Sequence, residues 1–329
     1  MTSSAFENRS SAEDDPGLVD VSVVALGGGH GLAANLSAVR TFCRDLTAIV
    51  TVADNGGSSG RLRREFGVLP PGDLRQALAA LCRDDEWGRT WARVLQHRFD
   101  GSGELHEHAV GNLLIVALWE LLDGYVAGLD WVGRLLGAEG RVLPMTAVPL
   151  DIEATIKGID PSKPAELSIV RGQVEVATTT GQVSSVRLVP PDPVACPEAL
   201  AAIDAADWVI LGPGSWYTSV LPHLLVPELL SALTDSSARR CVTLNLAPQH
   251  GETEGFSPST YLEVLAMHAP DLQIDVVLAD SAVGTGRRML EETVVGLGAE
   301  LVTAPIAAAD GTPRHDVRRL ARAYAELMR

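Results

Sequence analysis

The chain has 329 residues, 46% of them hydrophobic and 21% charged, which is typical of a soluble globular protein with one large domain or two modest ones. Its formal net charge is −16, so the basic surface of nucleic-acid binders is missing and we expect no such partner. The four cysteines lie far apart without a Cys-x-x-Cys pair, which argues against a zinc knuckle or a redox motif.

Residues 1–17 are polar and acidic and contain no apolar core of a signal peptide. We therefore predict a disordered tail over 1–17, followed by a single α/β domain over 18–329. No later stretch is apolar enough to span a membrane, so we expect a cytoplasmic protein.

The first elements form a strand–helix–strand unit. Residues 19–26 are nearly all apolar, as a strand buried on both faces requires, and a glycine loop follows at 27–31. Residues 32–43 carry apolar side chains at helical spacing, and 46–54 form the next strand. Such a unit is almost always parallel and right-handed.

A helical insertion is predicted over about 84–140. It is preceded by a helix over 74–82, for which Asp73 is the predicted N-cap. The helices of this region are expected at 74–82, 87–97, 110–122 and 129–136. An antiparallel β extension is predicted over about 141–190, because 167–170 and 173–176 flank the turn Arg171-Gly172 as a hairpin would.

The alternation of strands and helices returns after residue 197 and predicts an α/β fold with a parallel central sheet. Its elements are expected at 198–206 (helix), 208–211 (strand), 241–246 (strand), 260–268 (helix), 274–279 (strand) and 314–328 (helix).

Three loops rich in glycine and small polar residues follow apolar runs, at 27–31, 54–60 and 212–215. A strand that ends in glycines and leads into a helix leaves free N–H groups that bind phosphate. Since such loops meet at the carboxyl edge of a parallel sheet, they predict a site for a phosphorylated small molecule, a nucleotide in particular. The first loop also fits the loose pattern G-x-G-x-x-A, for which a plain tight turn is the alternative.

Several other polar residues are candidates for the same site. Asp54 could hold a ribose hydroxyl or a divalent cation, and the sequence leaves both open. Arg75 is either a phosphate clamp or a solvent-exposed arginine. Asn112 follows a His-x-His pair that favours a pocket edge over a metal site, and Asn245 could read a base or a ribose. Arg314 is either part of a helix start or of a cationic lid.

Many of these blocks occur together in one family. The chain resembles the gluconeogenesis factor family (YvcK type), distant relatives of 2-phospho-L-lactate transferase in the CofD-like superfamily. The matching blocks lie at 26–31, 49–54, 56–62, 69–75, 108, 111–113, 142–144, 211–215, 218–219, 245 and 251–253.

The resemblance implies a Rossmann-like three-layer sandwich that binds a nucleotide sugar, UDP-N-acetylglucosamine. It implies a bacterial regulator of cell shape, peptidoglycan precursor supply and gluconeogenic growth, without a cofactor or catalytic residues. A regulated enzyme of cell-wall precursor synthesis is the expected partner, and a homo-oligomer the expected state. The alternative is a transferase of a phosphorylated group, with Mg²⁺ at Asp54 and Asp73. A nicotinamide dehydrogenase is a weaker third possibility.

By resemblance, the first and third loops hold the diphosphate, and Asn245 lies toward the nucleoside. Two departures from the family are Asn55, where a second Asp is usual, and Val294, where many relatives have Tyr. The predicted nucleotide- and phosphate-binding residues are Gly28, Gly29, His30, Gly31, Asp54, Asn55, Gly56, Gly57, Ser58, Ser59, Arg61, Asp73, Arg75, Asn112, Gly212, Gly214, Ser215, Thr218, Asn245 and Arg314.

Overall fold

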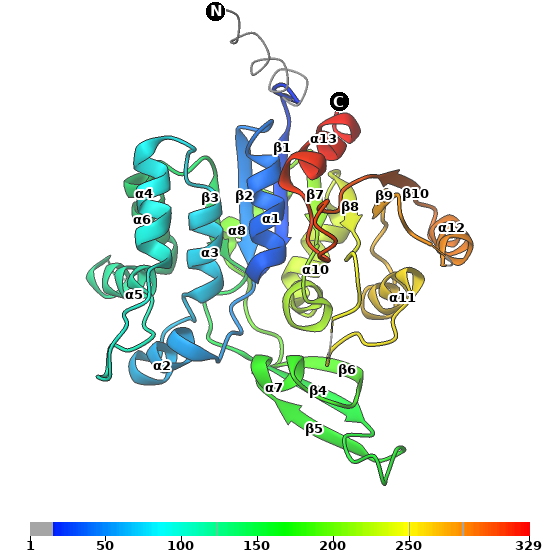
Figure 1. Ribbon diagram of the computed structural model, residues 1–329, viewed down its shortest axis with the longest axis horizontal. Helices are drawn as coiled ribbons and strands as arrows, with labels where there is room; N and C mark the ends of the chain where they lie inside the picture. The colour runs from blue at the N-terminus through cyan, green and yellow to red at the C-terminus, as the bar shows by residue number, and fades with distance from the viewer. Residues whose placement is uncertain (1–15, 123, 250, 285) are drawn as a thin grey trace, which may run out of the picture.

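A seven-stranded parallel sheet forms the centre of the protein, in the order β10-β9-β8-β7-β1-β2-β3 (Figure 1). The computed structural model describes residues 16–122, 124–249, 251–284 and 286–329, so nearly all of the predicted tail lies outside the described residues. The strands are β1 (Ser22–Gly27), β2 (Asp45–Val50), β3 (Arg141–Pro144), β7 (Trp208–Leu211), β8 (Arg239–Thr243), β9 (Val276–Asp280) and β10 (Glu300–Ala304).

The central strands are apolar because helices cover both faces of the sheet. All four residues of β7 are buried, as are five of the six in β1. Helices α1 and α3 lie in front of the central strands in Figure 1, and α8 lies behind them. This confirms the predicted three-layer α/β fold with a parallel sheet.

The helices pack through apolar stripes. In α1, Leu32, Leu36 and Val39 are buried at helical spacing, and this helix packs against α3 and α13. The helices are α1 (Gly29–Val39), α2 (Gly57–Phe66), α3 (Gly72–Ala80), α4 (Glu86–Gln96), α5 (Val110–Leu122), α6 (Tyr125–Leu136), α7 (Gln173–Ala177), α8 (Pro197–Asp204), η1 (Trp216–Val220, a π-helical turn), α9 (Leu221–Leu224), α10 (Pro227–Asp235), α11 (Pro258–His268), α12 (Arg287–Gly296) and α13 (Val317–Leu327).

The strand order reverses between β1 and β7. From β1 the chain continues to β2 and β3 on one side, and from β7 it continues to β8, β9 and β10 on the other. In open parallel sheets, the loops at such a reversal leave a crevice at the carboxyl edge, and ligands bind there. The loop after β1 and the loop after β7 are the first and third glycine loops of the sequence.

The β extension is a separate antiparallel sheet of β4 (Asp151–Lys157), β5 (Leu167–Arg171) and β6 (Gln182–Val189), with β4 in the middle. It projects from the end of the molecule opposite the described chain termini (Figure 1). It begins later than the expected 141, because β3 pairs with β2 in the main sheet. The predicted strand over 173–176 is wrong: these residues form α7, which buries Val176, and β6 pairs with β4 instead.

Two helix starts also differ from expectation. Helix α3 begins at Gly72 with Pro71 at its N-cap, so Asp73 lies inside the first turn and is not the cap. Helix α13 begins at Val317 because the Asp316 side chain accepts hydrogen bonds from the N–H groups of Arg318 and Arg319. Among the described residues, no helix has the length and apolar character needed to cross a membrane.

Candidate functional site

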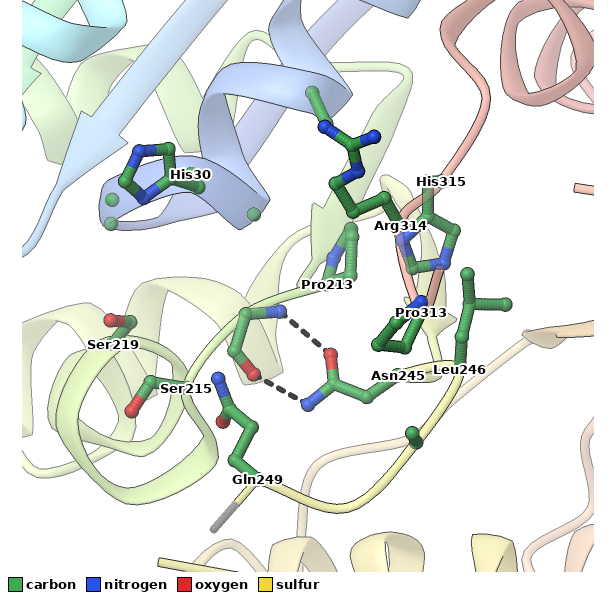
Figure 2. A pocket seen from close by; sticks show the side chains of 16 residues that line it. His30, Pro213, Ser215, Ser219, Asn245, Leu246, Gln249, Pro313, Arg314 and His315 are labelled. Carbon is green, nitrogen blue, oxygen red and sulfur yellow. Dashed lines mark hydrogen bonds between the residues drawn. The ribbon is translucent and has the colours of Figure 1, made fainter. Parts of the chain in front are cut away.

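A pocket of about 500 Å³ lies at the reversal point between β1 and β7 (Figure 2). Its size is within the range of small-molecule sites. The walls come from the loops after β1, β7 and β8 and from the segment that precedes α13. The lining residues are Gly28, Gly29, His30, Gly31, Ala34, Pro213, Gly214, Ser215, Ser219, Asn245, Leu246, Ala247, Gln249, Pro313, Arg314 and His315.

The N-terminus of α1 faces this pocket without a side-chain cap. Its N-cap is Gly28, and the first turn contains no acidic residue. Within the described chain, no hydrogen bond engages the backbone N–H groups of His30 and Gly31. Because the helix dipole adds partial positive charge at this end, α1 offers a place for an anion.

Glycines allow the two loops to touch. A Cβ atom on Gly31 would lie 2.3 Å from the carbonyl oxygen of Pro213 and 2.6 Å from Cα of Gly214. The contact is supported by Asn35, whose Nδ2 donates to the carbonyl oxygen of Gly212 at 2.9 Å. The loops therefore approach more closely than any residue with a side chain would permit.

Asn245 fixes the third loop through a two-way amide pair. Its Oδ1 accepts from the N–H of Gly214 at 2.9 Å, and its Nδ2 donates to the carbonyl oxygen of Gly214 at 2.7 Å (Figure 2). Asn245 thus lies in the pocket wall and holds the backbone of Gly214 in place.

The start of η1 is occupied by a carboxylate that our sequence reasoning missed. Glu252 accepts hydrogen bonds from the N–H groups of Tyr217 (2.8 Å) and Thr218 (2.9 Å). It also accepts one from Oγ of Ser215 at 2.5 Å. Burial raises the pKa of Glu252, and these hydrogen bonds oppose that rise. The family block at 251–253 is the signal that could have identified it.

Gln249 and His315 are two further pocket residues that we did not predict. Oε1 of Gln249 and Nε2 of His315 are buried and have no hydrogen-bond partner among the described residues. Burial lowers the pKa of His315 and favours its neutral form. They come from segments about 65 residues apart, so no local pattern brings them together.

Asp73 lies beside the first glycine loop, and Asp54 lies near Asp73, next to Gly56 and Gly72. The Asp73 carboxylate accepts the Gly29 N–H, and its Oδ2 would be 2.6 Å from a Cβ on Gly28. Burial, followed by the charge of Asp54, raises the pKa of Asp73 to about 7.

Arg75 completes this group and is not solvent-exposed, so that alternative is wrong. Its side chain is 2% exposed, and its Nε has no partner in the described structure. Burial lowers the pKa of Arg75 to about 10, and the charges of Asp73 and Asp54 oppose that shift.

The second glycine loop does not line the pocket. Oγ of Ser58 contacts Nδ1 of His108 and Nδ2 of Asn112, both at 3.0 Å, and Arg61 donates to the carbonyl oxygen of His106 at 2.7 Å. The predicted site residues outside the pocket lining are Asp54, Asn55, Gly56, Gly57, Ser58, Ser59, Arg61, Asp73, Arg75, Asn112, Gly212 and Thr218.

Asn55 connects the second loop to the β extension. Its Nδ2 donates to Oε2 of Glu175 at 2.7 Å, and its Oδ1 accepts from the N–H of Val174 at 3.1 Å. Asn55 therefore anchors α7 in this chain.

We expect Asn55→Asp to destabilise the protein by about 1–2 kcal/mol, because it removes the bond to Glu175 and places two carboxylates side by side. Urea unfolding at pH 7 measures this loss. Adding Glu175→Gln should recover most of it, since the glutamine amide can donate to the new carboxylate. If the urea midpoint of Asn55→Asp equals that of the wild type, Asn55 does not anchor α7.

The last two positions noted in the sequence differ in their surroundings. Arg314 lines the pocket, is mostly exposed and forms an ion pair with Asp310 at 2.8 Å. Val294 is buried in α12, so this position belongs to the core and not to the pocket lining.

Comparisons with known proteins find a family model and relatives that cover most of the chain. The family model described as 2-phospho-L-lactate transferase CofD matches residues 23–301. A protein of Mycobacterium tuberculosis named "Putative gluconeogenesis factor" is 53% identical over 302 residues, 91% of this chain and 88% of that protein. The gluconeogenesis factor of Listeria monocytogenes is 33% identical over 317 residues, 93% of this chain and 95% of its own.

A crystal structure of a UPF0052 family member from Bacillus halodurans has a similar fold. It superimposes with a TM-score of 0.81 at 31% sequence identity, covering 95% of this chain and 99% of that one. The chain therefore belongs to the gluconeogenesis factor family of YvcK type, which is related to 2-phospho-L-lactate transferase.

Proposed function

We propose that the pocket binds a nucleotide sugar, UDP-N-acetylglucosamine, with its diphosphate at the N-terminus of α1. The observation that supports this most is the start of α1, which offers the unengaged N–H groups of His30 and Gly31 to the pocket at the point where the strand order reverses. Arg314 lines the same pocket and can add a charge-assisted hydrogen bond to phosphate. The apolar side chains of Leu246 and Pro313 suit the flat face of a base.

The cellular role that we propose is regulatory. Bound nucleotide sugar would report the supply of peptidoglycan precursors, and the protein would adjust cell shape and gluconeogenic growth through an enzyme of precursor synthesis. The names of the relatives support the gluconeogenic part of this proposal. We further propose that the protein acts in the cytoplasm as a homo-oligomer.

Calorimetry with UDP-N-acetylglucosamine, UDP and GDP tests the ligand. We expect binding of both uridine nucleotides, and the tighter binding for the sugar nucleotide. Arg314→Ala should weaken UDP binding about tenfold, because a charge-assisted hydrogen bond is lost. Arg288→Ala, an exposed arginine on α12 paired with Glu292, is the matched control and should bind normally. If no uridine nucleotide produces heat, the proposal is wrong.

A second candidate is a transferase of a phosphorylated group, which the cluster of Asp54, Asp73 and Arg75 favours. Mg²⁺ is commonly held by one or two carboxylates together with substrate phosphates, and Asp54 with Asp73 fits that mode. The bound ion would balance charge on the phosphates. Release of nucleoside monophosphate or sugar phosphate that depends on Mg²⁺ and is lost in Asp54→Asn would support the transferase over the regulator.

A further inference from the structure

Two helix starts meet at the pocket, and they differ in which of their backbone N–H groups are already bound. At the start of α1, the Asp73 carboxyl group accepts the N–H of Gly29, while the N–H groups of His30 and Gly31 are unengaged in the described structure. The start of η1 has its N–H groups at Tyr217 and Thr218 bound by the Glu252 carboxylate. A phosphate can therefore bind the N–H groups of His30 and Gly31, whereas the N–H groups of Tyr217 and Thr218 are already held by Glu252.

The Glu252 carboxylate is held firmly in this position. Its side chain is buried, and the loop around it is pinned by Thr253, whose Oγ1 accepts from the N–H of Gln249 at 2.8 Å and contacts the Tyr261 hydroxyl at 3.0 Å. Gly251 has φ = 82° and passes close to the carbonyl oxygen of Ala177, where a Cβ would come within 2.7 Å. Glu252 cannot easily move aside for a ligand phosphate.

The pocket wall next to Glu252 offers hydrogen-bond acceptors. Oγ of Ser215 uses its only proton to donate to Glu252 and accepts from the Thr218 hydroxyl, which leaves one acceptor lone pair for a ligand. Gln249 lies beside Ser215 in Figure 2, and its Oε1 has no partner in the described chain. Among the residues that the structure describes, no basic side chain forms an ion pair with Glu252. This wall suits neutral groups that donate hydrogen bonds and repels anions.

We infer that Glu252 sets the direction of the ligand, with the diphosphate at α1 and an uncharged, hydroxyl-bearing sugar at Ser215 and Gln249, and that it rejects sugars carrying a carboxylate. The inference rests on the proposed nucleotide-sugar site and adds the sugar class to it. Glu252 is a positioning residue because it acts partly through Ser215. Its charge also determines which sugars the pocket accepts.

The test compares two ligands that differ only at C6 of the sugar: UDP-N-acetylglucosamine, with a hydroxymethyl group, and UDP-N-acetylglucosaminuronate, with a carboxylate. We expect the wild-type protein to bind the neutral sugar at least tenfold more tightly. Glu252→Gln keeps the shape and the acceptor for Tyr217 and Thr218 but removes the charge, so the ratio should fall below about threefold. Glu228→Gln, a glutamate that accepts from the N–H of Ala195 outside the pocket, should keep the wild-type ratio.

Binding of UDP alone distinguishes a failure of the proposed nucleotide site from a failure of the proposed role of Glu252. If wild-type protein binds no UDP, the nucleotide site itself is wrong. If it binds UDP but binds the two sugars equally, or if Glu252→Gln leaves their ratio unchanged, the role of Glu252 is overturned. Should Glu252→Gln fail to fold, the ratio of the two affinities in the wild type and the variant Ser215→Ala still test the inference. Ser215→Ala should weaken binding of UDP-N-acetylglucosamine about fivefold and leave UDP binding unchanged. Equal losses for both ligands would refute the inference.

Discussion

Gly31→Ala is expected to weaken nucleotide binding roughly 100-fold, which corresponds to about 3 kcal/mol. The new Cβ would lie 2.3 Å from the Pro213 carbonyl oxygen and 2.6 Å from Cα of Gly214, and both neighbours are backbone atoms. Relief of this overlap must move the loops after β1 and β7 apart and disturb the Asn245–Gly214 amide pair. We also expect a loss of about 1–3 kcal/mol in the free energy of unfolding, as overpacking generally costs.

Calorimetry with UDP and urea unfolding measure the two effects separately. The matched control is Gly296→Ala, at the end of α12, where a Cβ would meet no atom within 4 Å. This control should bind normally and gain up to about 1 kcal/mol of stability, because alanine favours helix over glycine. Normal UDP affinity in Gly31→Ala would mean that the close approach of the two loops does not form the site.

The parts of the fold that could be predicted are those with a local signal. An apolar run followed by glycines and an amphipathic helix identified β1, the first loop and α1, and the same logic located β7 and the third loop. Since parallel strands end at one edge, these patterns also predicted that the two loops meet, as the contact between Gly31 and Pro213 shows.

The parts that could not be predicted depend on contacts between distant segments. Residues 173–176 alternate like a strand, yet they form α7, whose Val174 N–H is bound by Asn55. The second loop has the composition of an anion site, but Ser58 turns to His108 and Asn112. Glu252 reaches the start of η1 across 35 positions of the chain, and such a partner leaves no periodic pattern in sequence.

The electrostatics of Asp73 lead to the second large prediction, a pH dependence of stability that Asp73→Asn should remove. The pKa of Asp73 is raised from 3.8 to about 7 in the folded protein, by burial and by the charge of Asp54. Between these values the folded state binds more protons than the unfolded state, so the contribution of Asp73 to stability falls as pH rises and levels off above about pH 7. From pH 5 to pH 8 this amounts to about 2–3 kcal/mol.

Urea unfolding of the wild type and of Asp73→Asn across this range isolates the effect of Asp73, because all other titratable groups are the same in both proteins. Asparagine mimics the protonated acid and can still accept the Gly29 N–H, so its stability relative to the wild type should grow by about 2–3 kcal/mol from pH 5 to pH 8. Asp310→Asn is the control: hydrogen bonds from Thr312 lower the pKa of Asp310 to about 2, so it stays ionised throughout. Parallel curves for the wild type and Asp73→Asn would mean that Asp73 ionises normally. Asp54 and Asp73 would then form a fully charged pair at neutral pH, which favours a bound cation and the transferase candidate over the regulator.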